Sequence, residues 1–198
     1  MSTLENILIT HAMSDFNTRL KKLRQTIINA AGFDLDSPQY QQLTKIITTV
    51  SNEKDNALTA FTEKFDSVTL KPDQFRIPAE KLKHAHENID NSLLEILRKS
   101  IKNVKKYQSE IFIGDKFSHP GIKYTPLKRV GLCVPGASAP LPSTVIMTAV
   151  PAIVAGVKEL ILVSPPRYNN SIHPVILALA HELNINEVYR LGGAHAVA

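Results

Sequence analysis

The feature that most constrains the fold of this 198-residue chain is an alternation of apolar segments between positions 130 and 191. Three apolar runs have the length of strands: 130–134, 159–164 and 187–191. The segments between them, 145–154 and 175–183, carry apolar residues over helical lengths. Short connections in the order strand, helix, strand, helix, strand require right-handed crossovers, and they predict an α/β fold with a parallel sheet. We expect helices to cover both faces of that sheet, because parallel sheets are normally buried.

Local signals predict where the two helices begin and end. Ser143 is a good N-cap for the first helix and Gly156 is a stop signal. Pro151 falls inside this helix and predicts a kink there, because proline removes a backbone hydrogen bond. Pro174 suits the first turn of the second helix. The glycine pair at 192–193 is expected to open a loop after the last strand.

The composition changes near residue 129. Residues 1–128 hold 34 of the 41 Asp, Glu, Lys and Arg residues, whereas nine of the twelve prolines lie between positions 120 and 174. We expect an N-terminal helix within 1–35 that is a candidate dimer contact, a mostly helical part over 36–128 with a short edge or loop at 68–77, and the sheet over 129–198. The stripes that predict the helices are Phe16, Leu20, Leu23 and Ile27; Leu43, Ile46, Ile47 and Val50; Leu58, Phe61 and Phe65; and Ile89, Leu93, Ile96, Leu97, Ile101 and Val104.

Several classes of protein are disfavoured. The net charge of +5 comes from lysines that are interleaved with acids, and the densest basic segment, 99–106, is typical of a solvated helix face, so nucleic acid is not an expected partner. No apolar run reaches the length of a membrane span, and the N-terminus lacks the basic flank of a signal peptide. Cys133 is the single cysteine, which excludes an internal disulfide and favours the cytoplasm.

The expected ligand site lies beyond the carboxyl ends of the three strands, at 135–143, 164–167 and 192–198. Ligands of open parallel sheets bind there. The first of these turns has small residues and leads into a helix N-terminus that suits an anion. A proline-stiffened connection without a ligand is the alternative. Neither a G-x-G-x-x-G fingerprint nor a phosphate-binding P-loop is present.

The histidines and the single cysteine could each have a chemical role or a structural one, and the sequence alone does not decide between these roles in every case. His195 follows the last strand and either binds a ligand or packs its own loop. Cys133 ends an apolar strand, where a buried inert thiol is favoured over a nucleophile. His84 and His86 are two positions apart, so on a helix they point in different directions and do not form a metal pair. His119 beside a proline is expected in an exposed turn. No metal site and no catalytic residue is predicted in this chain.

Several motifs, occurring in one order, resemble the histidinol dehydrogenase family. They are VGLCVPG at 130–136, APLPSTVIM at 139–147, AVPAIVAGVKE at 149–159, the proline pair at 165–166 and VYRLGGAHA at 188–196. Upstream, DNAL at 55–58 and FTEKFD at 61–66 match a further family segment. The resemblance runs from about residue 40 to residue 198.

The resemblance implies a zinc-dependent dehydrogenase of histidine biosynthesis, which oxidises L-histidinol through the aldehyde to L-histidine with two NAD. It implies homodimers with two incomplete Rossmann-like domains, of which residues 129–198 would be the first half of an NAD-binding one. The N-terminal helix would then contact the second subunit. The chain has less than half the family's usual length, and the family's zinc ligands and its Glu-His acid/base pair match no residue of it. We therefore expect it to be inactive alone, and a homodimer or a complementing C-terminal half to be its partner.

The expected NAD-binding turns differ from the family pattern at three positions. The family has Tyr at Cys133, a second Gly at Ala137 and Gln at His195, and the Tyr and Gln positions contact NAD. The expected cofactor-binding residues are therefore Cys133 and His195, both substituted, together with Pro135, Gly136, Gly192 and Gly193. Because each lost contact costs on the order of 1 kcal/mol, we expect weak or absent NAD binding. A degenerate, non-catalytic interaction module of the same family is the alternative, and an unrelated nucleotide-binding domain is a more distant one.

Overall fold

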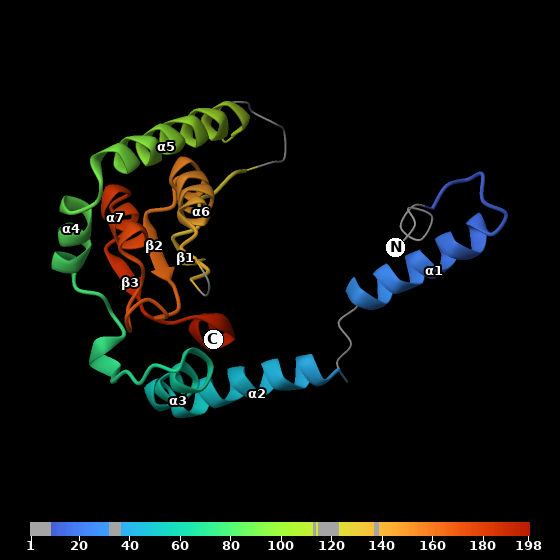
Figure 1. Ribbon diagram of the computed structural model, residues 1–198, viewed down its shortest axis with the longest axis horizontal. Helices are drawn as coiled ribbons and strands as arrows, with labels where there is room; N and C mark the ends of the chain where they lie inside the picture. The colour runs from blue at the N-terminus through green and yellow to red at the C-terminus, as the bar shows by residue number, and fades with distance from the viewer. Residues whose placement is uncertain (1–8, 32–36, 113, 115–122, 137–138) are drawn as a thin grey trace. The chain divides into compact units, whose positions relative to one another are not determined.

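A computed structural model describes residues 9–31, 37–112, 114, 123–136 and 139–198, and the chain divides into two compact units, Met1–Lys45 and Ile46–Ala198. Figure 1 draws the chain from its blue N-terminal helix to its red C-terminal end. The expectations for His119 and Ala137 lie outside the described residues.

The first unit holds α1 (Phe16–Ala31) and the beginning of α2 (Pro38–Glu53), which continues into the second unit. The predicted N-terminal helix is thus present. None of the described α1 side chains, 16–26, is buried, and Leu23 on its apolar stripe is 43% exposed. Within this unit, the described side chains of the stripe therefore form no buried core.

The second unit is built on a three-stranded sheet that confirms the predicted topology. Strands β1 (Arg129–Cys133), β2 (Glu159–Val163) and β3 (Glu187–Tyr189) are parallel and lie in the order β1-β2-β3 (Figure 1). Helix α6 (Pro142–Val154) connects β1 to β2, and α7 (Pro174–Glu182) connects β2 to β3. The central positions Leu132, Leu162 and Val188 are in register and buried.

One face of the sheet carries the main core. Leu132, Leu162 and Val188 share a buried cluster with apolar residues of α6 and α7, so both crossover helices lie on this face. A second helical layer, α4 (Ala79–Glu87) and α5 (Asn91–Ile111), packs outside them, α4 on α7 and α5 on α6 (Figure 1). The layer order is therefore sheet, crossover helices, outer helices.

The expectation that helices cover both faces of the sheet is met only in part among the described residues. On the opposite face Tyr189 packs against the cluster of Val68, Leu70, Phe75 and Leu191, and α8 (Gly193–Val197) contacts β1. Gly131 and Cys133 on this face are exposed, and a Cβ placed on Gly131 would meet nothing within 4 Å. The cause is the strand order: because the sheet grows in one direction only, two right-handed crossovers bring both helices to the same side. Covering the other face requires a chain that returns to the far side of β1.

Several element ends differ from the sequence signals. The N-cap of α6 is Leu141 with Pro142 in the first turn, so Ser143 is inside the helix and the predicted N-cap is wrong. Proline is preorganised for the first helical position because its ring fixes φ near the helical value. The N-cap therefore lies two residues before the predicted one. The helix runs through Pro151 to Val154, and the stop at Gly156 is confirmed by its φ of 87°.

The stripe from Ile89 to Val104 also has a different start from the predicted one. Ile89 precedes the helix, and Asp90 is the N-cap of α5, where its Oδ1 accepts a hydrogen bond of 2.9 Å from the Leu93 N–H. The separate helix α4 precedes this cap. Pro174 does begin α7, and the 192–193 glycines lead into a short helix, α8 (Gly193–Val197).

The segment 68–77, for which we expected a short edge or loop, is a loop that pairs with the edge of the sheet at one position. After α3 (Asp55–Asp66) and the 3-10 helix η2 (Pro72–Gln74), Arg76 forms an antiparallel bridge to Tyr189 of β3. The Ile77 N–H donates to the Val188 carbonyl at 2.8 Å, and the Arg190 N–H donates to the Phe75 carbonyl at 2.8 Å. The outer edge of β3 is thus paired, whereas β1 has no strand on its outer side among the described residues.

Candidate functional site

The turns that follow the three strands meet at one edge of the sheet. A Cβ on Gly136, after β1, would lie 2.9 Å from the Ser164 Oγ, and a Cβ on Gly192, after β3, would lie 2.7 Å from the Pro165 Cβ. Both glycines therefore allow their backbones to approach the turn after β2 more closely than any other residue could. This edge is the candidate functional site.

A small pocket of about 90 Å³ lies between the first two turns. Its volume suits one small group of a larger ligand rather than a whole nucleotide. The pocket is lined by Gly136, Ala139, Pro140, Ser164, Pro165, Arg167, Tyr168, His173 and Ile176.

Two of the three expected cofactor residues at the end of β1, Cys133 and Pro135, are exposed beside this edge. Cys133 is the last residue of β1 and its side chain is exposed on the uncovered face of the sheet, so the favoured reading of a buried thiol is wrong. Pro135 is exposed, and Gly136 is half-buried and lines the small pocket.

His195 lies away from the pocket, against α3. It is 2% exposed, and its ring centroid is 5.9 Å from that of Phe61 and 5.9 Å from that of Phe65. Burial lowers the pKa of His195, although the nearby Asp66 acts in the opposite direction, and its Nε2 has no hydrogen-bond partner. The ring therefore holds α8 against α3 as an uncharged packing group.

The glycine pair that precedes His195 has two different environments. Gly192 is buried against Pro165 and is the N-cap of α8. Gly193 is exposed and has a φ of 59°, in the left-handed region that favours glycine. The structure thus brings Gly136 and Gly192 together at the site, and it places Gly193 at the surface and His195 in the core.

Arg167 is a residue of this edge that sequence reasoning did not single out. Its Nε lies 2.7 Å from the Asp66 Oδ1, and its Nη2 donates to the Phe65 carbonyl at 2.8 Å. The Asp66 side chain is only 4% exposed, so the guanidinium neutralises a nearly buried carboxylate and joins the turn after β2 to the end of α3. The charge directly after the 165–166 proline pair is a local sign that Arg167 has a role at this edge. The sequence does not indicate its partner, which is 101 positions away.

His173 and Tyr168 form the polar wall of the small pocket. The His173 Nδ1 accepts a hydrogen bond of 3.2 Å from the Val175 N–H and so caps α7. Its ring packs edge-on against Tyr168 with centroids 4.5 Å apart, and burial lowers the pKa of His173. Burial therefore favours the uncharged form of the His173 ring in this wall.

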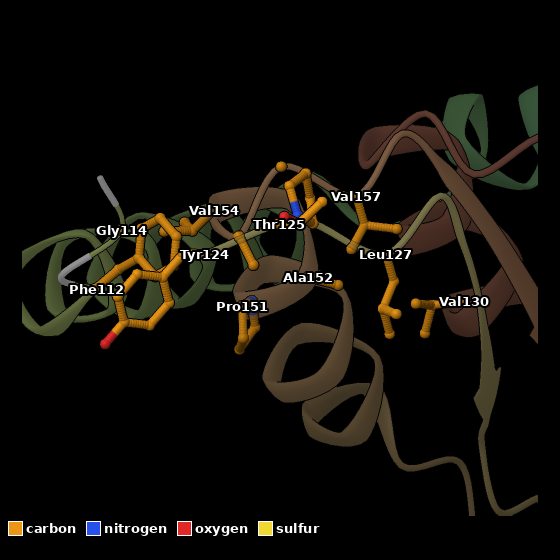
Figure 2. Close-up of a pocket in the computed structure, with 13 residues that line it drawn as sticks. Phe112, Gly114, Tyr124, Thr125, Leu127, Val130, Pro151, Ala152, Val154 and Val157 are labelled. Carbon is orange, nitrogen blue, oxygen red and sulfur yellow. The ribbon is translucent and has the colours of Figure 1, made fainter. Parts of the chain in front are cut away.

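A larger cavity of about 600 Å³ lies elsewhere, beside the start of β1 and the end of α6. Figure 2 shows its wall of Phe112, Tyr124, Leu127 and Pro151, with Val130 at one end. The residues that line it include no charged side chain. It lacks the groups that would orient a phosphate or a substrate charge, so we do not place the candidate site there.

Metal-binding groups do not gather in the described part of the chain. Within it, no three or more His, Cys, Asp or Glu side chains are placed to hold an ion. His86 instead pairs with Glu182, Nε2 to Oε2 at 2.6 Å, and His84 is exposed. No helix among the described residues is long and apolar enough to cross a membrane.

The sequence profile of the histidinol dehydrogenase family matches residues 34–198. The chain belongs to this family. The histidinol dehydrogenase of Rhodopirellula baltica is 43% identical over 155 residues, which are 75% of this chain and 34% of the relative. That of Gloeobacter violaceus is 34% identical over 193 residues, 93% of this chain and 42% of the relative.

A solved histidinol dehydrogenase shares the fold. The crystal structure from Elizabethkingia anophelis has a TM-score of 0.71 and 28% sequence identity, and the match covers 84% of this chain and 38% of that one. The chain thus spans well under half the length of these histidinol dehydrogenases.

Proposed function

We propose that this chain supplies part of the NAD site of a histidinol dehydrogenase and that oxidation of L-histidinol to L-histidine requires a complementing C-terminal portion. The observation that carries the proposal is the convergence of the turns at Gly136, Pro165 and Gly192 at the carboxyl edge of a parallel sheet. Nucleotides bind at this edge in open α/β sheets. Family membership gives the chemical class of the reaction.

NAD, when bound, accepts the hydride that the substrate alcohol loses. Gly136 and Gly192 suit this cofactor because they keep side chains out of the edge, while Pro135 and Gly193 are exposed beside them. Cys133 offers an exposed thiol where the family has an aromatic ring. The buried His195 ring offers no free donor to a ligand at the rim. We therefore propose that this chain holds NAD weakly.

Zinc does not fit the described residues, because no three suitable ligands lie together in them. We assign the zinc ligands and the acid/base pair to the complementing portion. The unburied apolar stripe of α1 supports a homodimer in which this helix docks on the second subunit. A cytoplasmic location is consistent with the single exposed thiol.

The test follows NADH formation from L-histidinol and NAD in the presence of zinc. The chain alone is expected to give none. A mixture with the part of the R. baltica enzyme outside its matched 34% is expected to give NADH. Turnover by the chain alone would refute the proposal. A folded, zinc-loaded mixture that forms no NADH would refute it as well.

The packing of His195 favours a second candidate, a non-catalytic interaction module of the same family. A ring that is 2% exposed between Phe61 and Phe65 serves the core rather than a ligand. Calorimetric titration with NAD separates the two functions. Weak binding that strengthens in Cys133→Tyr supports the enzyme, and no heat with either protein supports the module.

A further inference from the structure

The small pocket between the turns after β1 and β2 is lined by hydrogen-bond donors and by no acid. Its polar side chains are those of Ser164, Arg167, Tyr168 and His173, and each of them can donate a hydrogen bond. Asp66, the carboxylate that contacts Arg167, is not among the residues that line it. A cation would find no charged ligand in this wall, whereas an anion would find several donors.

Ser164 gives the clearest sign of a missing acceptor. The residue is only 1% exposed, and its backbone N–H donates to the Tyr189 carbonyl at 3.1 Å. Its hydroxyl, in contrast, makes no hydrogen bond to another described residue, although it lines the pocket. A hydroxyl that is removed from water without a partner costs free energy. A ligand that accepts a hydrogen bond from the Ser164 Oγ would recover this cost.

His173 adds an N–H donor to the same wall. Its Nδ1 accepts a hydrogen bond of 3.2 Å from the Val175 N–H, so the uncharged ring carries its proton on Nε2. This Nε2 makes no hydrogen bond to a described residue. The ring therefore lines the pocket with a donor that the fold itself does not use.

Arg167 keeps part of its guanidinium free for a ligand. The Nε contacts Asp66 at 2.7 Å, and the Nη2 donates to the Phe65 carbonyl at 2.8 Å. The Nη1 has no partner among the described residues. The guanidinium is thus held in place by the end of α3 and still offers N–H groups to an anion.

Two helices begin beside the pocket. Ala139 and Pro140 line it and lead into α6, whose N-cap Leu141 provides no side-chain cap. His173 is the N-cap of α7. The positive ends of both helix dipoles therefore favour negative charge in the pocket. Because His173 already caps α7, that helix contributes its dipole and the ring rather than free backbone donors.

The size of the pocket and its neighbours favour a terminal phosphate. A volume of about 90 Å³ suits a group of few atoms at the end of a molecule. A phosphate monoester carries a charge of about −1.5 to −2 and three strong acceptor oxygens. The phosphates inside a dinucleotide are linked on both sides and suit a small pocket less well. Cys133 and His195, the expected NAD contacts, do not line it.

We infer that the pocket lined by Ser164, Arg167, Tyr168 and His173 binds a terminal phosphate, either inorganic phosphate or the phosphate of a monoester, with the Ser164 hydroxyl and the His173 Nε2 as donors. The inference goes beyond the proposed NAD site and needs neither NAD nor the complementing portion. A bound phosphate would connect the turn after β2 with the start of α7. It should therefore stabilise the folded chain.

The experiment titrates the 198-residue chain with inorganic phosphate at an ionic strength held constant with chloride. Histidine ring resonances are followed by NMR, and the His173→Ser variant assigns those of His173. We expect the His173 resonances to shift saturably, with a dissociation constant in the millimolar range, and those of the exposed His84 to stay in place. The thermal unfolding midpoint should rise with phosphate. Glycerol phosphate replaces phosphate in a second arm, and tighter binding there would identify a monoester as the ligand.

Matched variants test the two donors. Ser164→Ala is expected to weaken phosphate binding by about tenfold or more, because a hydrogen bond to a charged group is lost. Ser109→Ala makes the same change on the exposed surface of α5 and should leave binding unaltered. His173→Ser keeps a side-chain oxygen that can cap α7, and it should weaken binding to a similar degree. It decides the question if Ser164→Ala does not fold, which thermal unfolding without phosphate shows.

The remaining results overturn the inference. Folded Ser164→Ala and His173→Ser proteins that bind phosphate as the parent chain does would place the anion elsewhere. Chloride shifts equal to those of phosphate would show that no phosphate site exists. NAD binding that Ser164→Ala weakens as much as phosphate binding would assign the pocket to the cofactor. Phosphate binding as expected, in a chain whose complemented mixture forms no NADH, would refute the proposed enzyme and leave this pocket standing.

Discussion

Gly131 and Gly192 are the same residue type in opposite surroundings. A Cβ on Gly192 would lie 2.7 Å from the Pro165 Cβ and 3.2 Å from its Cα, whereas Gly131 has open space. We expect Gly192→Ala to lower the free energy of unfolding by about 1–3 kcal/mol, because the turns after β2 and β3 must separate. Gly131→Ala is the control and should be neutral or slightly stabilising. Urea unfolding of both variants gives the comparison, and equal stability would contradict this packing.

His195 predicts a dependence of stability on pH. Burial lowers its pKa in the folded chain, so the unfolded chain takes up a proton first, near the ordinary pKa of about 6.5. The stabilisation is therefore complete above that pH and is lost as the pH falls below it, with a slope of at most about 1.4 kcal/mol per pH unit.

His195→Gln replaces the titratable ring with a side chain that does not titrate. The free energy of unfolding of the variant should therefore fall less steeply than that of the parent chain between neutral and mildly acidic pH. His173 has its pKa lowered in the same direction and remains in both proteins, so only the difference between them reports on position 195. Parallel pH profiles would show that the ring is not buried in solution.

At the scale of elements, the contact between Arg167 and Asp66 holds α3 to the sheet. Removal of the guanidinium leaves a carboxylate that is 4% exposed without its ion pair. We expect Arg167→Met to cost about 1.5–3 kcal/mol. Lys83→Met, which breaks an ion pair between side chains that are 66% and 56% exposed, should cost less than about 0.5 kcal/mol. Thermal unfolding measures both, and equal effects would contradict the anchoring role.

Most elements could be predicted from the sequence because their signals are local. The strands at 130, 159 and 187 and the helix start at Pro174 depend on runs of apolar residues and on proline chemistry within a few positions. The start of α6 was placed wrongly because Ser143 and Pro142 are competing signals and the proline decides. The contacts of Arg167 and His195 join residues about 100 or more positions apart, and no local pattern encodes them.

At the scale of the whole molecule, α1 predicts a dependence of assembly on the N-terminus. A variant without residues 1–35 should keep the unfolding transition of the second unit, because α2 and the cores beyond it are retained. It should lose self-association, since the unburied stripe of α1 is then gone. Analytical ultracentrifugation of both forms tests this, and a truncated protein that still dimerises would place the contact elsewhere.

At this scale, the sequence did not predict which face of the sheet the crossover helices cover. The alternation of elements predicts parallel strands and right-handed crossovers, and both are observed. It does not contain the spatial order of the strands, which decides whether successive helices fall on one side or on two. That order depends on contacts over the whole unit, such as the packing of α4 on α7.

The bridge between Arg76 and Tyr189 has a consequence for how copies of this chain can add to one another. Because the chain's own earlier segment already pairs with one border of the sheet, the border at Arg129–Cys133 is the one that the described residues leave for backbone pairing between copies. Two molecules that joined there would use up the vacant border of each, so growth would end at a pair instead of continuing as a fibre.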